Sequence, residues 1–212
     1  MSATPVVSSP PYWDEATREL IKCDRVLRKL IPRHPGACLV SRGNPFVTLA
    51  RSIVGQQISV PAAQAVWDRL TAALPDFSPA KVARMRVERL RACGLSQRKA
   101  EYIRDLAAHF RQGGMDLNDW RSLDDEAVVQ ALTQIRGVGR WTAEMFLIFN
   151  LMRPDVLPID DIGLMRAVSQ HYFGGEPVTR AELREVGGNW APWRSVGVWF
   201  MWRSLDPIAV EY

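Results

Sequence analysis

The sequence has few cysteines, no long apolar run and no stretch in which polar and apolar residues alternate as in a strand. Its three cysteines, Cys23, Cys38 and Cys93, are an odd number at wide spacings, which predicts neither a disulfide framework nor a zinc knuckle. No segment approaches the roughly 20 apolar residues that cross a bilayer, and no basic segment with an apolar leader opens the chain. We therefore expect a soluble, cytoplasmic protein with reduced thiols and no membrane partner.

The composition is that of an ordinary folded domain with a modest basic excess. Of the 212 residues, 47% are hydrophobic and 24% are charged, which excludes a disordered chain. Lys and Arg number 27 against 23 Asp and Glu, so the formal net charge is +4. This excess suits a polyanionic partner and equally suits a solvated basic surface, so charge alone does not decide between them.

Apolar residues recur at helical spacing through nearly the whole chain after a Ser- and Pro-rich start. Asn44 and Ser96 are expected N-caps, Pro45 is expected at the first helical position, and Gly113 is expected to stop a helix. Further helices are predicted over residues 124–133, 141–150, 162–171, 179–185 and 193–204. The predicted fold class is all-α with two lobes: a flexible tail (1–12), one lobe from 13–44 plus 151–212, and a second lobe from 45–150.

The segment LTQIRGVGRWTAEMFLIF, residues 132–149, contains a helix, a glycine turn and a second helix. Gly137 and Gly139 predict a tight hairpin whose backbone approaches another molecule closely. Amides at the start of the second helix favour an anionic oxygen such as a DNA phosphate. A plain turn between two helices explains the same glycines, so this pattern leaves both interpretations open.

The segment LPIDDIGLMRAV, residues 157–168, places a second aspartate 161 − 139 = 22 positions beyond the hairpin. Asp161 is expected at the N-terminus of a helix, where the dipole and free amides favour the ionised carboxylate. Such a carboxylate can stabilise the oxocarbenium-like sugar cation of glycosidic cleavage and orient water. Simple helix capping is the alternative for an Asp-Asp pair, and on these residues alone it stays open.

Five segments occur in an order that resembles one known family: SIVGQQISVPAA, GLSQRKAEYI, IRGVGRWTAEMFLIF, LPIDDIGLMRAV and WAPWRSVGVWFMW. Over residues 16–205 the chain resembles the helix-hairpin-helix (HhH-GPD) DNA glycosylases, in particular the bacterial 3-methyladenine DNA glycosylase II type. The resemblance implies a helix-hairpin-helix at 125–149, an active-site cleft between the lobes, Asp161 as the catalytic residue and Asp160 as a neighbouring cap. The chain looks like a compact form without the extra N-terminal domain of longer relatives.

The resemblance also assigns a partner and binding residues. The implied partner is double-stranded DNA that contains alkylated bases, and the chain is expected to act as a monomer in the nucleoid. The Gln56–Ile58 turn is the implied wedge that enters the DNA stack. The residues implied to contact DNA belong to the hairpin and to this turn: Gly137, Val138, Gly139, Arg140, Thr142, Gln56, Gln57 and Ile58.

The family pattern further implies hydrolysis without strand cleavage. In members that nick the backbone, a lysine follows the GVGR-like turn and forms a Schiff base, whereas this chain has Trp141 there. No cofactor is required, and the three cysteines do not match the four-cysteine iron–sulfur pattern of some relatives. The carbonyls of Thr133, Ile135 and Gly137 are implied ligands of a structural Na⁺ or K⁺.

Aromatic residues indicate the expected substrate. Alkylated purines are cationic and leave readily, so they can be recognised by stacking and cation–π attraction. Trp141 and Trp202 are the candidate pocket residues, and Met145 stands where some relatives carry tyrosine. Core packing is the alternative for each tryptophan. Arg194 either contacts phosphate or ties two helices together through a buried carboxylate.

Three functions stay open on the sequence. The first is a monofunctional glycosylase that removes alkylated purines in base excision repair, leaving an abasic site. The second is a non-catalytic helix-hairpin-helix protein that binds damaged DNA. The third is a glycosylase for deaminated or oxidised bases. Asp161 separates the first from the second, because a binding module needs no such carboxylate.

Overall fold

The computed structural model describes residues 9–41, 43–112 and 117–205. Every regular element in these ranges is helical, which confirms the predicted all-α class. The described residues divide into two compact units. We call residues 43–112 and 117–151 the hairpin unit, and residues 9–41 and 152–205 the discontinuous unit. None of the helices in the described ranges combines the length and apolar character that crossing a membrane requires.

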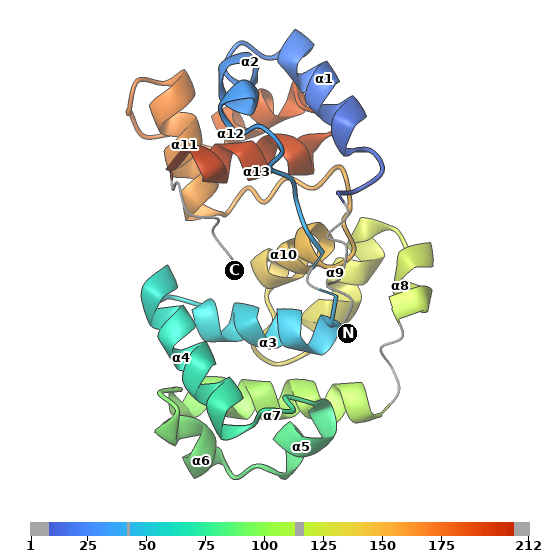
Figure 1. Cartoon of the computed structure of the whole chain (residues 1–212), viewed down its shortest axis with the longest axis vertical. Coiled ribbons are helices and arrows are strands. Elements are labelled where there is room, and N and C mark those ends of the chain that lie inside the picture. The colour runs from blue at the N-terminus through green and yellow to red at the C-terminus, as the bar shows by residue number, and fades with distance from the viewer. Residues whose placement is uncertain (1–8, 42, 113–116, 206–212) are drawn as a thin grey trace, which may run out of the picture. The chain divides into compact units, whose positions relative to one another are not determined.

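The hairpin unit is built around α3, which packs against α4, α7 and α10 (Figure 1). Its apolar residues Leu49, Ala50 and Ile53 recur at helical spacing and are completely buried. The helices of this unit are α3 (Pro45–Gly55), α4 (Val60–Ala73), α5 (Pro79–Arg84), α6 (Val87–Ala92), α7 (Gln97–Arg111), α8 (Leu117–Ser122), α9 (Asp125–Thr133) and α10 (Arg140–Phe149).

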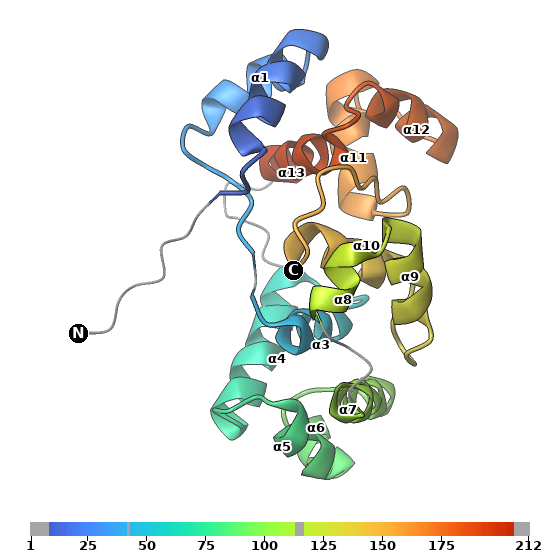
Figure 2. The ribbon, with the colours of Figure 1, turned by 90° about the vertical axis from the view of Figure 1, so that its right-hand side faces the viewer.

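The discontinuous unit is built around α13, which contacts α1, α2, α11 and α12 (Figure 2). Because this helix is surrounded by other helices, it is apolar on nearly every side. The elements of this unit are α1 (Trp13–Cys23), α2 (Leu27–Leu30), the 3-10 helix η1 (Ile31–Arg33), α11 (Ile162–Tyr172), α12 (Arg180–Gly188) and α13 (Arg194–Leu205).

The predicted N-caps are confirmed by their hydrogen bonds. The side chain of Asn44 accepts from the amide of Val47, with Pro45 in the first turn, and the side chain of Ser96 accepts from the amide of Lys99. The helix α4 begins at Val60, and the side chain of its N-cap Ser59 accepts from the amide of Ala62. The predicted stop at Gly113 lies outside the described residues.

The predicted N-terminal tail ends in ordered structure. Residues 1–8 lie outside the described ranges, but Pro10 is buried and the Tyr12 ring stacks on Trp193 at a centroid distance of 5.8 Å. The hydroxyl of Tyr12 donates to the carbonyl of Met152 at 2.8 Å, and burial raises the pKa of Tyr12 to about 12. Residues 10–12 are therefore packed rather than loose.

Asp24 joins three parts of the discontinuous unit. It is only 5% exposed, and its Oδ1 accepts from the amides of Val26 and Leu27 at 2.8 and 2.9 Å. Its Oδ2 accepts from the Tyr172 hydroxyl at 2.8 Å and from the Trp190 indole at 3.2 Å. A buried charge needs partners of this kind, so Asp24 ties the start of α2 to the end of α11 and to Trp190.

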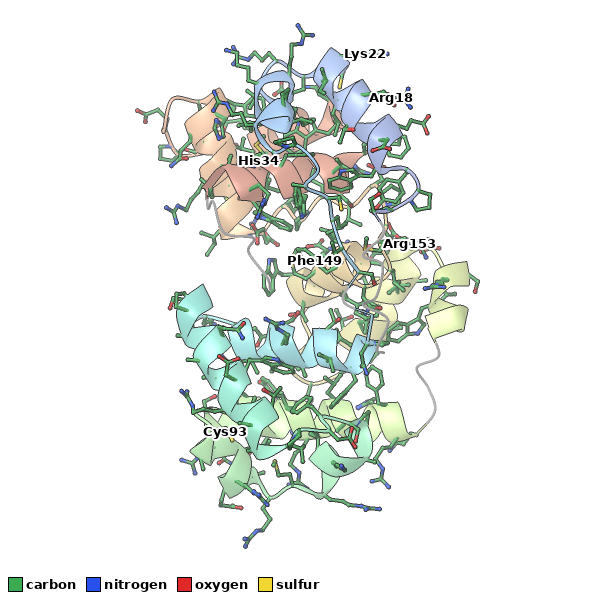
Figure 3. The ribbon with its side chains drawn as sticks, viewed as in Figure 1. Arg18, Lys22, His34, Cys93, Phe149 and Arg153 are labelled. Carbon is green, nitrogen blue, oxygen red and sulfur yellow. The ribbon has the colours of Figure 1, made fainter. Side chains whose placement is uncertain are left out.

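The three cysteines are all free thiols. Cys23 is exposed, Cys38 is half-buried, and Cys93 is buried where α6 ends (Figure 3). Burial is the main cause that raises the thiol pKa of both Cys23 and Cys38. A reactive cysteine has a lowered thiol pKa, which is the opposite of the direction at Cys23 and Cys38.

Candidate functional site

Asp161 is held at the start of α11 by two hydrogen bonds to the same oxygen. Its Oδ1 accepts from the amide of Leu164 at 2.6 Å and from the indole N–H of Trp202 at 2.8 Å. Asp161 is only 4% exposed. The position therefore combines the N-cap expected of such an aspartate with a fixed, nearly buried carboxylate at the positive end of a helix.

Asp160 was the expected cap, and this expectation is wrong. Asp161 itself occupies the N-cap position, whereas the Oδ1 of Asp160 pairs with the Nε of Arg180 at 2.6 Å. Two adjacent aspartates cannot both reach the amides of the first turn, and the second lies closer to them. The cap and the predicted catalytic carboxylate are thus one residue.

Gly163 leaves the room that the contact between Asp161 and Trp202 requires. A Cβ atom at this position would lie 3.2 Å from the Oδ1 of Asp161 and 3.4 Å from the Cδ1 of Trp202. Both distances are at or below the tight end of real Cβ contacts. Glycine at residue 163 therefore lets the indole approach the carboxylate, a role that the sequence does not indicate.

The loop that leads to Asp161 is fixed by the start of α13. Arg194 binds Asp155 through two parallel hydrogen bonds, Nε to Oδ1 at 2.6 Å and Nη2 to Oδ2 at 2.9 Å. The hydroxyl of Ser195 accepts from the amide of Val156 at 2.9 Å. The predicted tie of two helices through a buried carboxylate is wrong in both details, because Arg194 joins the start of α13 to a loop and the Asp155 side chain is 32% exposed. The pair anchors the chain a few residues before Asp161.

The hairpin joins α9 to α10 through residues 134–139. Gly137 has a φ of +85°, and a Cβ there would lie 2.2 Å from the Tyr102 ring of α7. Gly139 is the N-cap of α10, no side chain caps it, and a Cβ there would meet nothing within 4 Å. The first glycine is thus required by packing, whereas the second leaves the start of a ten-residue helix open to a partner.

Arg140, a predicted DNA contact, forms salt bridges within the hairpin. Its guanidinium binds Glu126 of α9 through Nη1 at 3.0 Å and Nη2 at 2.6 Å, and its Nε lies 3.3 Å from the buried Glu144. The hydrogen bond from Arg140 lowers the pKa of the Glu126 carboxyl. Arg140 therefore links the two helices of the hairpin in the free protein.

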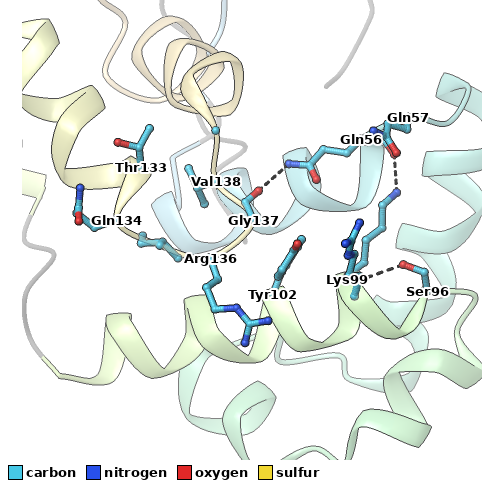
Figure 4. Close-up of a pocket in the computed structure, with 13 residues that line it drawn as sticks. Gln56, Gln57, Ser96, Lys99, Tyr102, Thr133, Gln134, Arg136, Gly137 and Val138 are labelled. Atoms are coloured by element: carbon cyan, nitrogen blue, oxygen red, sulfur yellow. Dashed lines mark hydrogen bonds between the residues drawn. The ribbon is translucent and has the colours of Figure 1, made fainter.

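The predicted wedge divides into one inward and two exposed residues. The side-chain amide of Gln56 donates to the carbonyl of Gly137 at 2.8 Å (Figure 4). It also donates to the hydroxyl of Thr142 at 3.2 Å. Thr142, also a predicted DNA contact, is 2% exposed. Gln57 and Ile58 are exposed, with Ile58 at 41%. Gln56 thus fastens the turn to the hairpin, and its two successors face solvent.

A cavity of about 560 Å³ lies between this turn, the start of α7 and the hairpin. Its cationic lining residues are Arg98, Lys99 and Arg136. The guanidinium of Arg136 lies over the Tyr102 ring, 5.8 Å from its centroid (Figure 4). Because Lys99 donates to two carbonyls, Arg98 and Arg136 are the lining cations that suit a phosphodiester backbone.

Of the three carbonyls expected to bind a monovalent ion, two already accept hydrogen bonds within the protein. The Gly137 carbonyl accepts from Gln56, and the Ile135 carbonyl accepts from the amide of Val138 at 3.0 Å. A carbonyl has two lone pairs, so neither bond excludes an ion. The described residues contain no group of three or more His, Cys, Asp or Glu side chains placed to hold a metal.

The predicted base-pocket residues differ in exposure. Trp141 is half-buried at the start of α10, and Met145 of the same helix is completely buried in the hairpin unit. Trp202 is 4% exposed, and its polar edge is directed at Asp161. The structure therefore brings Trp202 to the carboxylate, while the burial of Met145 favours packing over contact with a base.

Sequence reasoning missed two residues near these sites. Lys99 donates to the carbonyls of Val54 and Gln56 at 2.7 and 2.6 Å (Figure 4). Ile162, directly after Asp161, is 74% exposed. A lysine in an amphipathic helix is common, so the sequence does not indicate that Lys99 contacts the carbonyls of another helix. The apolar residue at 162 could have been noticed, because it follows a cap where side chains commonly face solvent.

Comparison with protein families gives one matching family model. Residues 50–192 match the model described as "HhH-GPD superfamily base excision DNA repair protein". The match spans the Gln56–Ile58 turn, the hairpin and the Asp161 segment.

Individual relatives are similar over most of the chain. A Bacillus subtilis protein named "Putative DNA-3-methyladenine glycosylase YfjP" is 27% identical over 188 residues, which are 85% of this chain and 66% of that protein. The chain thus spans just under two thirds of this relative.

Two solved structures have the same fold over nearly their full lengths. A DNA-3-methyladenine glycosidase from Bacillus halodurans superposes with a TM-score of 0.77 at 34% identity, covering 97% of this chain and 94% of that one. The 3-methyladenine DNA glycosylase Mag1 of Schizosaccharomyces pombe, solved with abasic DNA, gives 0.82 at 27% identity, covering 93% and 99%.

Proposed function

The chain belongs to the HhH-GPD superfamily of base excision DNA repair proteins, and we propose that it is a monofunctional DNA-3-methyladenine glycosylase. It extrudes an alkylated purine from duplex DNA and hydrolyses the bond between the base and C1′ of the sugar. The bond from C1′ to the base breaks with its electron pair on the departing base, water adds its oxygen to C1′ and loses a proton to solvent, and an abasic site remains in an intact strand. The names of the relative and of the two solved structures support this substrate class.

The single observation that carries the proposal is the fixed carboxylate of Asp161. Cleavage builds positive charge on the sugar, and a preorganised carboxylate stabilises that charge more in the transition state than in the ground state. The bonds from Leu164 and Trp202 hold Asp161 in one orientation. An alkylated purine leaves as a neutral base, so little acid catalysis is needed.

The hairpin unit binds the DNA backbone in this proposal. The open start of α10 at Gly139 receives a phosphate through backbone amides. Gln57 and Ile58 fill the gap left by the extruded base, because both are exposed on a turn that is fastened to the hairpin. The enzyme acts as a monomer in the cytoplasm, at the nucleoid. A Na⁺ or K⁺ held by the Thr133, Ile135 and Gly137 carbonyls would add positive charge beside that phosphate.

A base-release assay tests the proposal. The protein is incubated with methylated duplex DNA, and released bases are separated by chromatography. We expect release of 3-methyladenine, and a loss of at least about a hundredfold in the Asp161→Asn protein, the scale seen when one charge-stabilising group is removed. Asp160→Asn is the matched control, because this neighbour makes only an exposed ion pair with Arg180.

Two results would contradict the proposal. Wild-type release by Asp161→Asn would show that the carboxylate has no catalytic role. Release of uracil or hypoxanthine, with none of any alkylated purine, would assign the enzyme to deaminated bases instead.

A further inference from the structure

The inserting turn, residues Gln56–Ile58, is held weakly by its own backbone. Gln57 has a φ of +59°, a left-handed backbone conformation that residues other than Gly, Asn and Asp seldom adopt. The two backbone bonds around it, Gln56 to Ile53 and Ile58 to Gly55, are both long at 3.4 Å. Such conformations persist only where the surroundings impose them.

Lys99 supplies that restraint from the neighbouring helix. Its ammonium reaches from the first turn of α7 and donates to the carbonyl of Val54 at 2.7 Å and to that of Gln56 at 2.6 Å (Figure 4). On the opposite side, the Gln56 side chain donates to the Gly137 carbonyl. The turn is therefore clamped between α7 and the hairpin.

The two carbonyls that Lys99 contacts differ in their position relative to the turn. The Val54 carbonyl belongs to the last turn of α3, where a cation is favourable for any helix. The Gln56 carbonyl belongs to the C-cap residue of α3, directly before the left-handed Gln57, so the bond from Lys99 to this carbonyl restrains the turn as well as capping the helix. Burial lowers the pKa of Lys99, so holding the ammonium there has a cost that an uncharged cap would avoid.

We propose that Lys99 is a positioning residue for base extrusion, which keeps Gln57 and Ile58 in the conformation that enters the DNA stack. The inference rests on the proposed glycosylase function. A turn that is already ordered loses little conformational freedom when it inserts, so more of the binding free energy drives extrusion. Lys99 acts through the turn and does not touch the base.

The test compares a paired lesion with an unpaired one. Single-turnover rates are measured for Lys99→Met on a site-specific 7-methylguanine in duplex DNA and on the same strand alone, where no partner base must be replaced. We expect a rate about tenfold lower on the duplex and unchanged on the single strand. The matched control is Lys81→Met, which removes an exposed lysine of α5 that pairs only with Asp76. Equal losses on both substrates, or no loss on the duplex, would overturn the inference.

A second measurement does not depend on activity. Hydrogen exchange of the amides of residues 56–58 is compared in the free proteins, together with their melting temperatures. We expect faster exchange in Lys99→Met than in wild type or Lys81→Met, with similar melting. Unchanged exchange would overturn the inference about Lys99, whether or not the wild type releases a base. Failure of the wild type to release a base would, by itself, contradict only the proposed function.

Discussion

The indole N–H of Trp202 points at Asp161, with 2.8 Å between Nε1 and Oδ1. Trp202 comes from α13 and Asp161 from the start of α11, and these helices pack directly on each other. The sequence suggested Trp202 as a stacking surface for the base. The structure gives it a polar function as well, because its only donor orients the carboxylate.

Replacing Trp202 by phenylalanine separates these two functions. The ring is kept and the donor is lost, so we expect an excision rate about tenfold lower, in line with the loss of one hydrogen bond to a charged group. Single-turnover kinetics on methylated duplex DNA measure the rate, and thermal melting reports on the fold. A wild-type rate in a folded Trp202→Phe protein would show that orientation of Asp161 by the indole is unimportant.

Alanine substitutions of the two hairpin glycines are expected to change different properties, stability at residue 137 and DNA binding at residue 139. Gly137→Ala places a methyl group against Tyr102 at a positive φ and should destabilise the protein by about 2 kcal/mol. Gly139→Ala meets no neighbour and should reduce stability by less than about 1 kcal/mol while weakening DNA binding. Urea denaturation and fluorescence anisotropy with abasic DNA distinguish the two. Full DNA affinity in Gly139→Ala would remove the start of α10 from the interface.

Borohydride trapping tests the predicted absence of strand cleavage. A lyase forms a Schiff base between a lysine and the sugar, and Trp141 stands where the cleaving relatives carry that lysine. We expect no covalent adduct after incubation with abasic or methylated DNA and borohydride, and no nicked strand. A trapped adduct would show that another amine of this chain attacks the sugar.

Asp24 is expected to support the fold and not the chemistry. Replacement by alanine leaves the Tyr172 hydroxyl, the Trp190 indole and two amides without their shared acceptor. We expect a loss of about 3 kcal/mol in the free energy of unfolding. Denaturant titration measures it, with Asp76→Ala, an exposed aspartate, as the control. A change below about 1 kcal/mol would mean that water replaces the carboxylate.

Helix positions were predictable because short-range rules decide them. Asn44 and Ser96 cap their helices as expected, since the capping bond spans only three residues of sequence. The segments of the hairpin and of Asp161 were found for the same reason. The roles of the site residues stay predictions.

Contacts over long sequence distances were not predictable. Lys99 binds carbonyls 43 and 45 residues away, and Gly137 is required by Tyr102 of another helix. The choice between Asp160 and Asp161 as the cap depended on the register at which α11 begins, which the pair itself does not reveal. The burial of Met145 likewise follows from the packing of α10 and not from its local sequence.

The pairing of Arg140 with Glu126 and Glu144 has a consequence for the ionic-strength dependence of DNA binding. Each phosphate neutralised by a protein cation steepens the decline of log K with log salt by about 0.9. The guanidinium of Arg140 is already neutralised within the hairpin, and amides at the start of α10 carry no net charge to exchange for counterions. This hairpin can therefore bind a phosphate while few counterions are released from the DNA. Its contribution to DNA affinity should persist at salt concentrations that weaken lysine- or arginine-based contacts.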